Sequence, residues 1–292
     1  MQKNNILFII NPISGGHNKE EIVKNIPKLL NVNKFNVSIV YTKYAGHAVE
    51  IAKKAVEENR DTVVAVGGDG TINEVASQLV NTNTTLAIIP CGSGNGLARD
   101  LGISLNYKKA LQQIDSLNTK KIDVGVCNHQ YFFSLAGIGF DAKVAYDFNQ
   151  GKKRKFFGYV WAILKDFFSS KNQYFEIVLE NEKIIDDFFF ITVANCSQWG
   201  YNVKVAPNAK LDDGIFAINL CKKPSLFSII PFGIKVLTGN IERSKYVILK
   251  TAKKITITSK KDFYYHIDGD AKGISRQIHI NILHKALIIK SK

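Results

Sequence analysis

The sequence lacks the features that mark secreted, zinc-binding or membrane-spanning proteins. Its four cysteines are widely spaced and form no CxxC pair, which favours a reducing compartment over a disulfide framework and leaves no zinc spacing. The longest apolar stretch, Leu226–Leu237, contains Pro231 and Lys235 and is too short to span a bilayer. The N-terminal apolar run Ile6–Ile10 predicts a strand and not a signal peptide.

Two common nucleotide motifs are also missing or weak. There is no GxxxxGK[ST] motif, which excludes a P-loop enzyme. GIGFDA at Gly137–Ala142 matches the loose dinucleotide pattern GxGxxA, but it stands outside the series of strand and helix units, so it is weak evidence for a dinucleotide.

The charge balance is the unusual feature of the composition. The 292 residues are enough for two domains, and the formal net charge is +14. Such a charge points to a polyanionic partner: nucleic acid, an anionic membrane or a phosphorylated ligand. Since no nucleic-acid-binding module is recognisable, we expect no nucleic-acid partner.

The stretch Thr62–Glu74, TVVAVGGDGTINE, predicts a buried strand, a glycine turn and the start of a helix. Thr62–Val66 is a β-branched run typical of central parallel strands. Thr71 and Glu74 have the spacing of a capping box with Thr71 as the N-cap, and N–H groups at a helix N-terminus form an anion site. Asp69 lies inside this turn, and a carboxylate beside a phosphate requires a cation, so Mg²⁺ is implied. The alternative is an ordinary tight turn with a cap.

Strand and helix patterns alternate over the first 120 residues. The predicted strands are Ile6–Ile10, Val37–Tyr41, Thr62–Val66 and Leu86–Ile89, and glycine-containing turns follow all of them. This alternation predicts a parallel, doubly wound sheet, in which ligands lie beyond the carboxyl ends of the strands. Four glycine turns at one sheet edge indicate a nucleotide phosphate site.

Three segments resemble a known family. NPISGG (11–16), GGDGTINEVA (67–76) and PCGSGNGLARDL (90–101), in this order and spacing, resemble the catalytic domain of the diacylglycerol kinase family, related to sphingosine and ceramide kinases and including bacterial soluble lipid kinases. The later GIGFDA, APNAKLDDGIF and HIDGDA segments also fit, so the resemblance covers nearly the whole chain. It implies ATP and Mg²⁺ as cofactors and transfer of the γ-phosphoryl group to a lipid hydroxyl.

The resemblance implies roles for individual residues. Asp69, with Mg²⁺, would neutralise phosphate charge, and Asp270 would be the general base, with Asp268 as the alternative. The residues implied in ATP binding are Asn11, Pro12, Ile13, Ser14, Gly15, Thr42, Gly67, Gly68, Asp69, Gly70, Thr71, Ile72, Asn73, Glu74, Gly92, Ser93, Gly94 and Asn95.

A structural Mg²⁺ is implied at Lys210, Asp213 and Ile215, with Asp213 as the side-chain ligand and the other two residues binding through carbonyls. Octahedral Mg²⁺ keeps several waters, so one carboxylate with carbonyls suffices. The alternative is that the DDG sequence here is simply a turn.

The sequence departs from the family pattern at three positions. Ser93 replaces a threonine and keeps the hydroxyl, and Gly96 stands where relatives have aspartate. Asp270 replaces a glutamate, which shortens its reach by roughly 1.5 Å. For Asp268 and Asp270 the alternative is a hairpin turn, since Asp-Gly is a strong turn signal, and we interpret His266 as structural.

The second half of the chain predicts an antiparallel β-sandwich. Its short apolar runs are separated by turn signals and are Ile122–Cys127, Tyr131–Ala136, Phe175–Leu179, Phe188–Ala194, Ile215–Leu220, Ile255–Thr258, Phe263–Ile267 and Ile278–Ile282. We expect residues 1–120 to form the ATP-binding α/β domain, residues 121–285 the sandwich that binds the lipid, and residues 286–292 a candidate return strand to the first domain.

Lys152–Ser170, KKRKFFGYVWAILKDFFSS, has apolar side chains at helical spacing after four basic residues. It predicts either a core helix or an element that meets an anionic bilayer. Lys152–Lys155 are the expected membrane contacts, and a second set is Arg243, Lys245, Lys253 and Lys254.

The sequence therefore predicts an α/β nucleotide-binding domain joined to a β-sandwich, with the activity of an ATP- and Mg²⁺-dependent lipid kinase. Its expected partners are ATP, a membrane lipid acceptor and an anionic membrane surface, and its expected location is cytoplasmic, peripheral at the inner membrane face. A homodimer is allowed. The alternatives are an NAD kinase-like enzyme and a non-catalytic lipid or nucleotide sensor.

Overall fold

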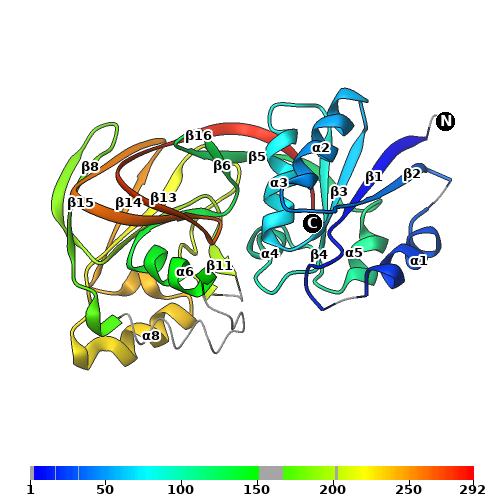
Figure 1. The fold of residues 1–292 in the computed structure, drawn as a ribbon. Helices are drawn as coiled ribbons and strands as arrows, with labels where there is room; N and C mark the ends of the chain where they lie inside the picture. The colour runs from blue at the N-terminus through cyan, green and yellow to red at the C-terminus, as the bar shows by residue number, and fades with distance from the viewer. Residues whose placement is uncertain (1–2, 17, 32, 151–166, 201–202) are drawn as a thin grey trace. The chain divides into compact units, whose positions relative to one another are not determined.

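The computed structural model describes residues 3–16, 18–31, 33–150, 167–200 and 203–292 (Figure 1). The chain divides into two compact units. The first comprises Met1–Val124, Gly200–Asn202 and His284–Lys292, and the second comprises Gly125–Trp199 and Val203–Leu283. The predicted fold class, an α/β domain followed by a β-sandwich, is confirmed.

A parallel sheet forms the centre of the first unit. Its strands are β1 (Asn4–Ile10), β2 (Phe35–Tyr41), β3 (Thr62–Gly67) and β4 (Thr85–Pro90), in the order β4-β3-β1-β2. All six residues of β3 are buried, because this strand lies between two others and helices cover the sheet. This is the environment that its β-branched sequence predicts.

In the part of the first unit that the structure describes, five helices connect the strands and cover both faces of the sheet. The chain moves outward from β1 to β2 and then back across β1 to β3, so right-handed connections place α1 on one face and α2 on the other. Accordingly α1 packs with α5, and α2 packs with α3 (Figure 1). The helices are α1 (Lys19–Leu29), α2 (His47–Glu57), α3 (Asp69–Leu79), α4 (Gly96–Asp100) and α5 (Tyr107–Gln113).

Antiparallel strands form the second unit, although most of β5 and the last part of β16 belong to the first unit. The main order is β14-β13-β10-β7-β15-β16, with β8 and β9 added beside β15 and β5 and β6 beside β16. These strands are β5 (Asn118–Cys127), β6 (Gln130–Phe132), β7 (Leu135–Gly139), β8 (Gln173–Val178), β9 (Lys183–Phe188), β10 (Phe190–Ala194), β13 (Phe216–Cys221), β14 (Val247–Ala252), β15 (Lys254–Ile267) and β16 (Asp270–Ser291).

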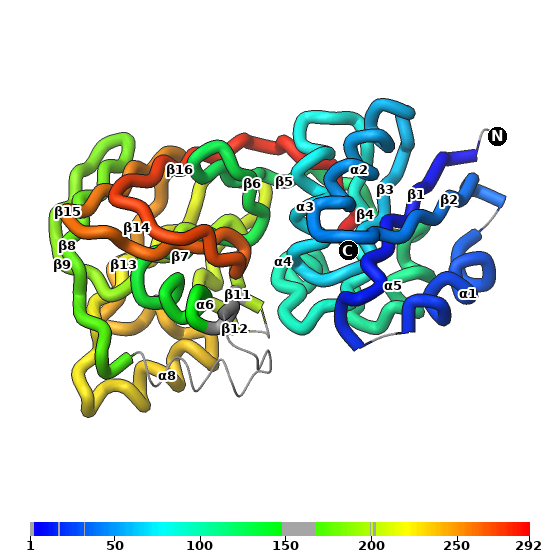
Figure 2. The backbone as a smooth tube through the Cα atoms, in the orientation of Figure 1, coloured from blue at the N-terminus to red at the C-terminus, as the bar shows by residue number. Residues whose placement is uncertain are grey.

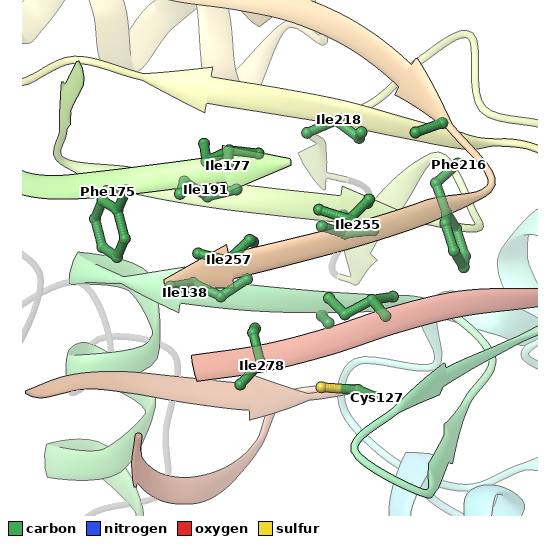
Figure 3. Packing of buried hydrophobic residues seen from close by; sticks show 14 of the residues in the cluster. Cys127, Ile138, Phe175, Ile177, Ile191, Phe216, Ile218, Ile255, Ile257 and Ile278 are labelled. Atoms are coloured by element: carbon green, nitrogen blue, oxygen red, sulfur yellow. The ribbon is translucent and has the colours of Figure 1, made fainter. Parts of the chain in front are cut away.

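A buried apolar cluster holds the strands of the second unit together (Figure 3). Ile138, Ile191 and Ile257 come from three different strands and are fully buried. The remaining elements of this unit are short: α6 (Phe140–Gln150), β11 (Gln198–Gly200), β12 (Val203–Lys204), η1 (Leu226–Ser228), α8 (Ile229–Leu237) and η2 (Ile241–Arg243). Among the described residues, no helix is both long and apolar enough to cross a bilayer.

Two predicted strands are each divided in the structure. The run Tyr131–Ala136 is split between β6 and β7, because the N–H groups of Phe133 and Ser134 donate to the carboxylate of Asp268 instead of to a neighbouring strand. The run Phe188–Ala194 is split between β9 and β10 at Phe189, whose N–H donates to the Cys221 carbonyl.

Other predicted strands are joined. Ile255–Thr258 and Phe263–Ile267 both belong to β15, which has an irregularity in its pairing between Thr258 and Phe263. The 22-residue strand β16 contains Ile278–Ile282 and continues to Ser291. Its last part pairs in parallel with β4, at Ile289 and Leu86, and Figure 2 shows the C-terminal end of the chain beside β4.

The predicted basic and aromatic helix Lys152–Ser170 lies outside the described residues, apart from its last part, Phe167–Ser170. In that part Phe167 is buried, and its ring centroid lies 5.3 Å from that of Phe189. Phe168 is 65% exposed.

Candidate functional site

A hollow of about 330 Å³ opens at the carboxyl edge of the first unit's sheet. It lies where the strand order 2-1-3-4 reverses direction between β1 and β3, which is the usual ligand position in such sheets. Three turns supply its walls, after β1, β2 and β3. The lining residues are Asn11, Pro12, Ile13, Ser14, Thr42, Lys43, Tyr44, Ala45, Gly68, Gly70, Thr71 and Glu74.

The turn after β1 is fixed by the side chain of Asn11. Its Nδ2 donates to Thr71 Oγ1 at 2.9 Å, and its Oδ1 accepts from the N–H of Ile13 at 3.1 Å. The Ser14 hydroxyl donates to the Asn11 carbonyl at 3.0 Å. The asparagine thereby ties its own turn to the first turn of α3.

The predicted capping box at Thr71 and Glu74 is wrong. Helix α3 begins at Asp69, and its N-cap is Gly68, three residues before the predicted cap at Thr71. Thr71 is buried beside Gly67, where an added Cβ would lie 2.5 Å from Thr71 Cβ. Glu74 Oε1 accepts instead from the N–H of Gly46, at 3.1 Å. Because Gly68 has no side chain, the positive end of α3 faces the hollow without a side-chain cap from this residue.

Asp69 connects the third glycine turn to the fourth. Its Oδ2 accepts from the N–H of Asn95 at 2.9 Å and its Oδ1 from the N–H of Gly96 at 3.1 Å. Burial raises the pKa of the Asp69 carboxyl above its ordinary value, against the lowering effect of these N–H groups and of Arg99. The carboxylate thus serves as the cap at the start of α4.

The fourth turn folds onto itself and lies outside the lining of the hollow. Asn95 has a left-handed backbone (φ 52°), and its side chain accepts from the N–H of Gly92 and donates to the Gly92 carbonyl. An added Cβ at Gly94 would lie 2.9 Å from Asp69 Oδ2. The expected ATP-binding residues that do not line the hollow are Gly15, Gly67, Asp69, Ile72, Asn73, Gly92, Ser93, Gly94 and Asn95.

In the second unit, Asp268 and Asp270 lie at the hairpin between β15 and β16. Asp268 and Gly269 both have positive φ (50° and 81°) and connect the paired residues Ile267 and Asp270, as in a two-residue type I′ turn. Asp270 has an exposed side chain, and its Oδ2 lies 2.7 Å from the Lys272 ammonium.

The Asp268 carboxylate points back into the second unit. It accepts three backbone N–H groups, from Phe133 at 3.0 Å, Ser134 at 2.8 Å and Leu135 at 3.0 Å. The N–H of Asp268 in turn donates to the Leu135 carbonyl at 2.9 Å. The two aspartates of HIDGDA therefore have different environments: Asp268 is half-buried and accepts three N–H groups, whereas Asp270 is exposed.

His266 joins this hairpin to the GIGFDA segment. It is buried, its Nε2 lies 3.4 Å from Asp141 Oδ2, and its Nδ1 accepts from the N–H of Gly269 at 3.3 Å. At Gly137 an added Cβ would lie 2.1 Å from His266 Nε2 and 2.4 Å from Asp141 Oδ2. Close packing of this pair therefore accounts for the glycine, without a dinucleotide.

The three residues of the expected structural Mg²⁺ site lie on a turn before β13. Asp213 is exposed, and its Oδ1 accepts from the N–H of Ile215 at 3.2 Å, while Gly214 has a left-handed backbone (φ 76°). One carboxylate on an exposed turn fits a hydrated Mg²⁺ ion that is held mainly by carbonyls and water. Among the described residues, no three or more His, Cys, Asp or Glu side chains gather as a metal site.

Comparison with known proteins assigns the chain to a family. Residues 5–127 match the diacylglycerol kinase catalytic domain, and residues 134–289 match the YegS C-terminal NAD kinase beta sandwich-like domain. A diacylglycerol kinase of Staphylococcus aureus (strain bovine RF122 / ET3-1) is 31% identical over 281 residues, which cover 91% of this chain and 86% of the relative. The chain belongs to the diacylglycerol kinase family. The predicted family is thus confirmed, and so is the prediction of an enzyme, at the level of a lipid kinase family.

Other relatives of the diacylglycerol kinase family agree with this assignment. A diacylglycerol kinase of Bacillus subtilis (strain 168) is 28% identical over 98% of this chain and 96% of its own length. A crystal structure from Bacillus anthracis str. Sterne has a TM-score of 0.82 at 25% identity and covers 99% of this chain and 95% of that one. A second crystal structure from that strain, of a diacylglycerol kinase, has a TM-score of 0.76 at 22% identity and shows the fold alone.

The sequence patterns did not predict the roles of several residues that the structure reveals. Tyr44 lines the hollow with a 56% exposed ring stacked on His47, with 4.6 Å between ring centroids. Lys19 is buried, and its ammonium group donates to the Ser14 carbonyl beneath the first turn. Asp123 is fully buried, and its Oδ1 accepts from the N–H of Lys285 at 2.6 Å. The sequence feature that could have drawn attention to Asp123 is the presence of a carboxylate inside the apolar run Ile122–Cys127.

Proposed function

We propose that the chain transfers the γ-phosphoryl group of ATP, with Mg²⁺, to the hydroxyl of a membrane lipid, diacylglycerol or a related acceptor. The observation that carries this proposal is the hollow at the positive end of α3, walled by three turns of the parallel sheet. Phosphoryl transfer depends on cradled phosphates and on neutralised charge, with little covalent chemistry from the protein. The N–H groups of the first turn of α3 and the hydroxyls of Ser14, Thr42 and Thr71 supply such a cradle.

The polar and apolar residues of the hollow suggest how ATP lies in it. The phosphates face Gly68, Gly70 and Thr71 at the start of α3, where partial positive charge gathers. Ile13, 90% exposed, and the free face of the Tyr44 ring offer apolar surface to a purine.

The acidic residues of the site fit a bound cation. Glu74 lines the hollow, and a carboxylate near ATP phosphates is repelled unless Mg²⁺ lies between them. Asp69 does not line the hollow, but its carboxylate lies at the start of α3 and adds negative charge that a hydrated cation would offset. Mg²⁺ would supply charge neutralisation and alignment of the phosphates.

We assign the general base to Asp270 in preference to Asp268. A base must have a free oxygen that can reach a hydroxyl proton. Asp270 is exposed and lies beside the ammonium group of Lys272. Both oxygens of Asp268 instead accept hydrogen bonds, from three N–H groups in total. If the Asp268 carboxylate moved away from these N–H groups to act as a base, the turn that it stabilises would be disrupted.

The decisive experiment is a transfer assay with radiolabelled ATP, in the presence and absence of Mg²⁺. Diacylglycerol, phosphatidylglycerol, a sphingoid base and ceramide are offered in vesicles, and NAD is offered in solution. We expect Mg²⁺-dependent label in a lipid and none in NAD. Label in NAD alone would establish the NAD kinase-like alternative, and ATP binding without transfer to any acceptor would establish the sensor.

Two adjacent glycines provide a test of the nucleotide site. Gly15 has φ +57°, and an added Cβ would lie 1.6 Å from the Cys91 carbonyl oxygen, so Gly15→Ala must displace the first turn. At Gly16 an added Cβ meets nothing within 4 Å. We expect Gly15→Ala to weaken ATP binding about tenfold or more, measured by calorimetry, because the turn carries four lining residues.

Gly16→Ala is the matched control, because it makes the same chemical change one residue away. We expect its ATP affinity to stay within about twofold of wild type and its melting temperature within about 3 °C of wild type, whereas Gly15→Ala should melt at a lower temperature because its turn has to shift. Equal affinities of the two variants would contradict this location of the nucleotide.

A further inference from the structure

The second unit presents an apolar ridge to solvent on η1 and α8. Phe227 is 96% exposed and Ile230 is 75% exposed. At about 100° per residue the members of the ridge fall on one side of the helical segment. They are Leu226 (65% exposed), Phe227, Ile230, Ile234 (56%) and Leu237 (66%).

The opposite side of α8 is packed against the second unit. Ile229, Phe232 and Val236 contact the buried cluster that contains Phe189 and Phe190. The helix that carries the ridge is therefore already packed against the second unit on its other side. The exposure of the ridge side chains is not caused by a helix that has come away from the unit. A helix that is apolar on all sides belongs in a core or in an apolar medium, and contiguous exposed apolar side chains mark interaction sites.

A polar pocket of about 230 Å³ opens directly beside the ridge. The Tyr246 hydroxyl lies 2.9 Å from Ser228 Oγ and 3.2 Å from Ser225 Oγ, and the Lys235 ammonium donates to the Arg243 carbonyl at 2.9 Å. The pocket thus combines hydroxyl groups with cationic side chains. Its lining residues are Ser228, Pro231, Phe232, Lys235, Arg243, Ser244, Lys245 and Tyr246.

Positive charge dominates the segment that carries the ridge and the pocket. The one carboxylate between Lys222 and Tyr246 is Glu242, and its Oε2 accepts from Asn208 Nδ2 at 2.6 Å. The cationic residues of the segment are Lys222, which pairs with Asp186 at 2.6 Å, and Lys223, Lys235, Arg243 and Lys245.

We infer that η1, α8 and the pocket beside them form a docking surface for a bilayer that contains anionic phospholipid. The ridge enters the boundary between headgroups and acyl chains, and the pocket receives a headgroup phosphate through its hydroxyls and cations. This inference rests in part on the proposed function, because a kinase whose acceptor is a membrane lipid has to meet the bilayer, but its test requires no phosphoryl transfer.

The chemistry favours a bilayer over the other occupants. A second copy of this chain would bring two basic rims together around a two-fold axis, and like charges at close range oppose association. Nucleic-acid bases stack on aromatic side chains, but four of the five side chains of the ridge are aliphatic, which disfavours a nucleic acid. Of these three occupants, anionic phospholipid is the one that satisfies both the apolar ridge and the cationic pocket.

The surface also bears on the expected membrane contacts. Lys152–Lys155 lie outside the described residues. In the second expected set, Arg243 and Lys245 line the pocket, whereas the N–H groups of Lys253 and Lys254 donate to Glu180 Oε1. Arg243 and Lys245 are therefore the members of this set that we assign to the docking surface, because they line the pocket.

The test is co-flotation of the full chain with vesicles of phosphatidylcholine, with and without phosphatidylglycerol. We expect wild type to bind the anionic vesicles and to release as salt rises. Phe227→Ser should weaken this binding about tenfold or more through the lost burial of its ring. Lys245→Ala should weaken it about fivefold at low salt.

Matched controls separate the surface from general apolarity and charge. Ile185→Ser removes a 52% exposed apolar side chain from β9, and Lys53→Ala removes an exposed cation from α2. We expect both to bind like wild type. Size-exclusion chromatography with light scattering on wild type and Phe227→Ser checks for a second copy on the ridge.

Three results would overturn the inference. These are wild-type affinity of Phe227→Ser for anionic vesicles, no binding of wild type to any vesicle, and a wild-type dimer that Phe227→Ser converts to a monomer. A chain that binds vesicles through the ridge yet transfers no phosphoryl group would leave the docking surface standing and would refute the proposed function, so the two failures are distinguishable.

Discussion

Asp268→Ala is expected to lower the free energy of unfolding of the second unit by about 3 kcal/mol or more. The substitution leaves three N–H groups, those of Phe133, Ser134 and Leu135, without their acceptor. A half-buried N–H group without a partner costs about 1–3 kcal/mol, and water repays part of that cost. Because domains of this size lose about 2–4 °C per kcal/mol, a fall in melting temperature of about 6–12 °C should appear in a thermal scan.

Asp268→Asn tests whether the lost acceptor oxygens cause this loss of stability. Asp268 Oδ1 accepts from Ser134 and Leu135, and Oδ2 accepts from Phe133. Asparagine keeps one acceptor oxygen, tolerates the left-handed backbone of this position and places its NH₂ group against the remaining donor. We therefore expect a stability between those of wild type and Asp268→Ala.

Asp262→Ala is the control for this series, because Asp262 is exposed and its partner among the described side chains is exposed Arg276, at 2.7 Å. Such a pair is worth about 0–1 kcal/mol, so the variant should melt close to wild type. If Asp268→Ala and Asp262→Ala had the same melting temperature, the three hydrogen bonds would not contribute to stability. The structural role that we assign to Asp268 would then be wrong.

The sequence could predict the parts of this fold that local patterns determine. The β-branched run before GGDG is a fully buried central strand, and the glycine turns after β1, β2 and β3 meet at one edge because parallel strands place their carboxyl ends together. The Asp-Gly pair of HIDGDA predicts a hairpin, and the two positive φ values there are what that pair tolerates best.

The remaining details depend on partners far away in the sequence. Thr71 has the spacing of an N-cap, but its hydroxyl accepts from Asn11, 60 residues before it, and the helix begins at Asp69. Ser134 interrupts a predicted strand because its N–H finds a carboxylate 134 residues away. No local pattern contains such a pairing, and the same is true of Tyr44, which reaches the hollow only through the geometry of the second turn.

The apolar stretch Leu226–Leu237 illustrates a different limit. Its length excludes a membrane span, but hydrophobicity alone cannot separate a buried helix from one that faces a bilayer. The division of its side chains between a packed side and an exposed ridge appears only when the rest of the second unit is in place.

Asp270→Ala is expected to reduce the turnover number for lipid phosphorylation by about 10²–10⁴-fold and to leave the melting temperature unchanged. Loss of a general base typically costs a factor in this range. The substitution should not affect folding, because Asp270 is exposed and its ion pair with Lys272 is worth at most about 1 kcal/mol. The readouts are single-turnover transfer from labelled ATP and a thermal scan on the same samples.

Three companion variants separate the base from a merely acidic surface. Asp270→Glu should retain much of the activity, since the added methylene extends its reach by roughly 1.5 Å and keeps the carboxylate. Lys272→Ala removes the ion pair but not the carboxylate, and it should stay within about threefold of wild type. Asp268→Ala should act mainly on stability, so kinetics at a temperature well below its melting point would show a smaller loss than Asp270→Ala. If turnover instead survives in Asp270→Ala and disappears in folded Asp268→Ala, the proton acceptor is Asp268, and its hydrogen bonds to Phe133, Ser134 and Leu135 would have to rearrange when the lipid binds.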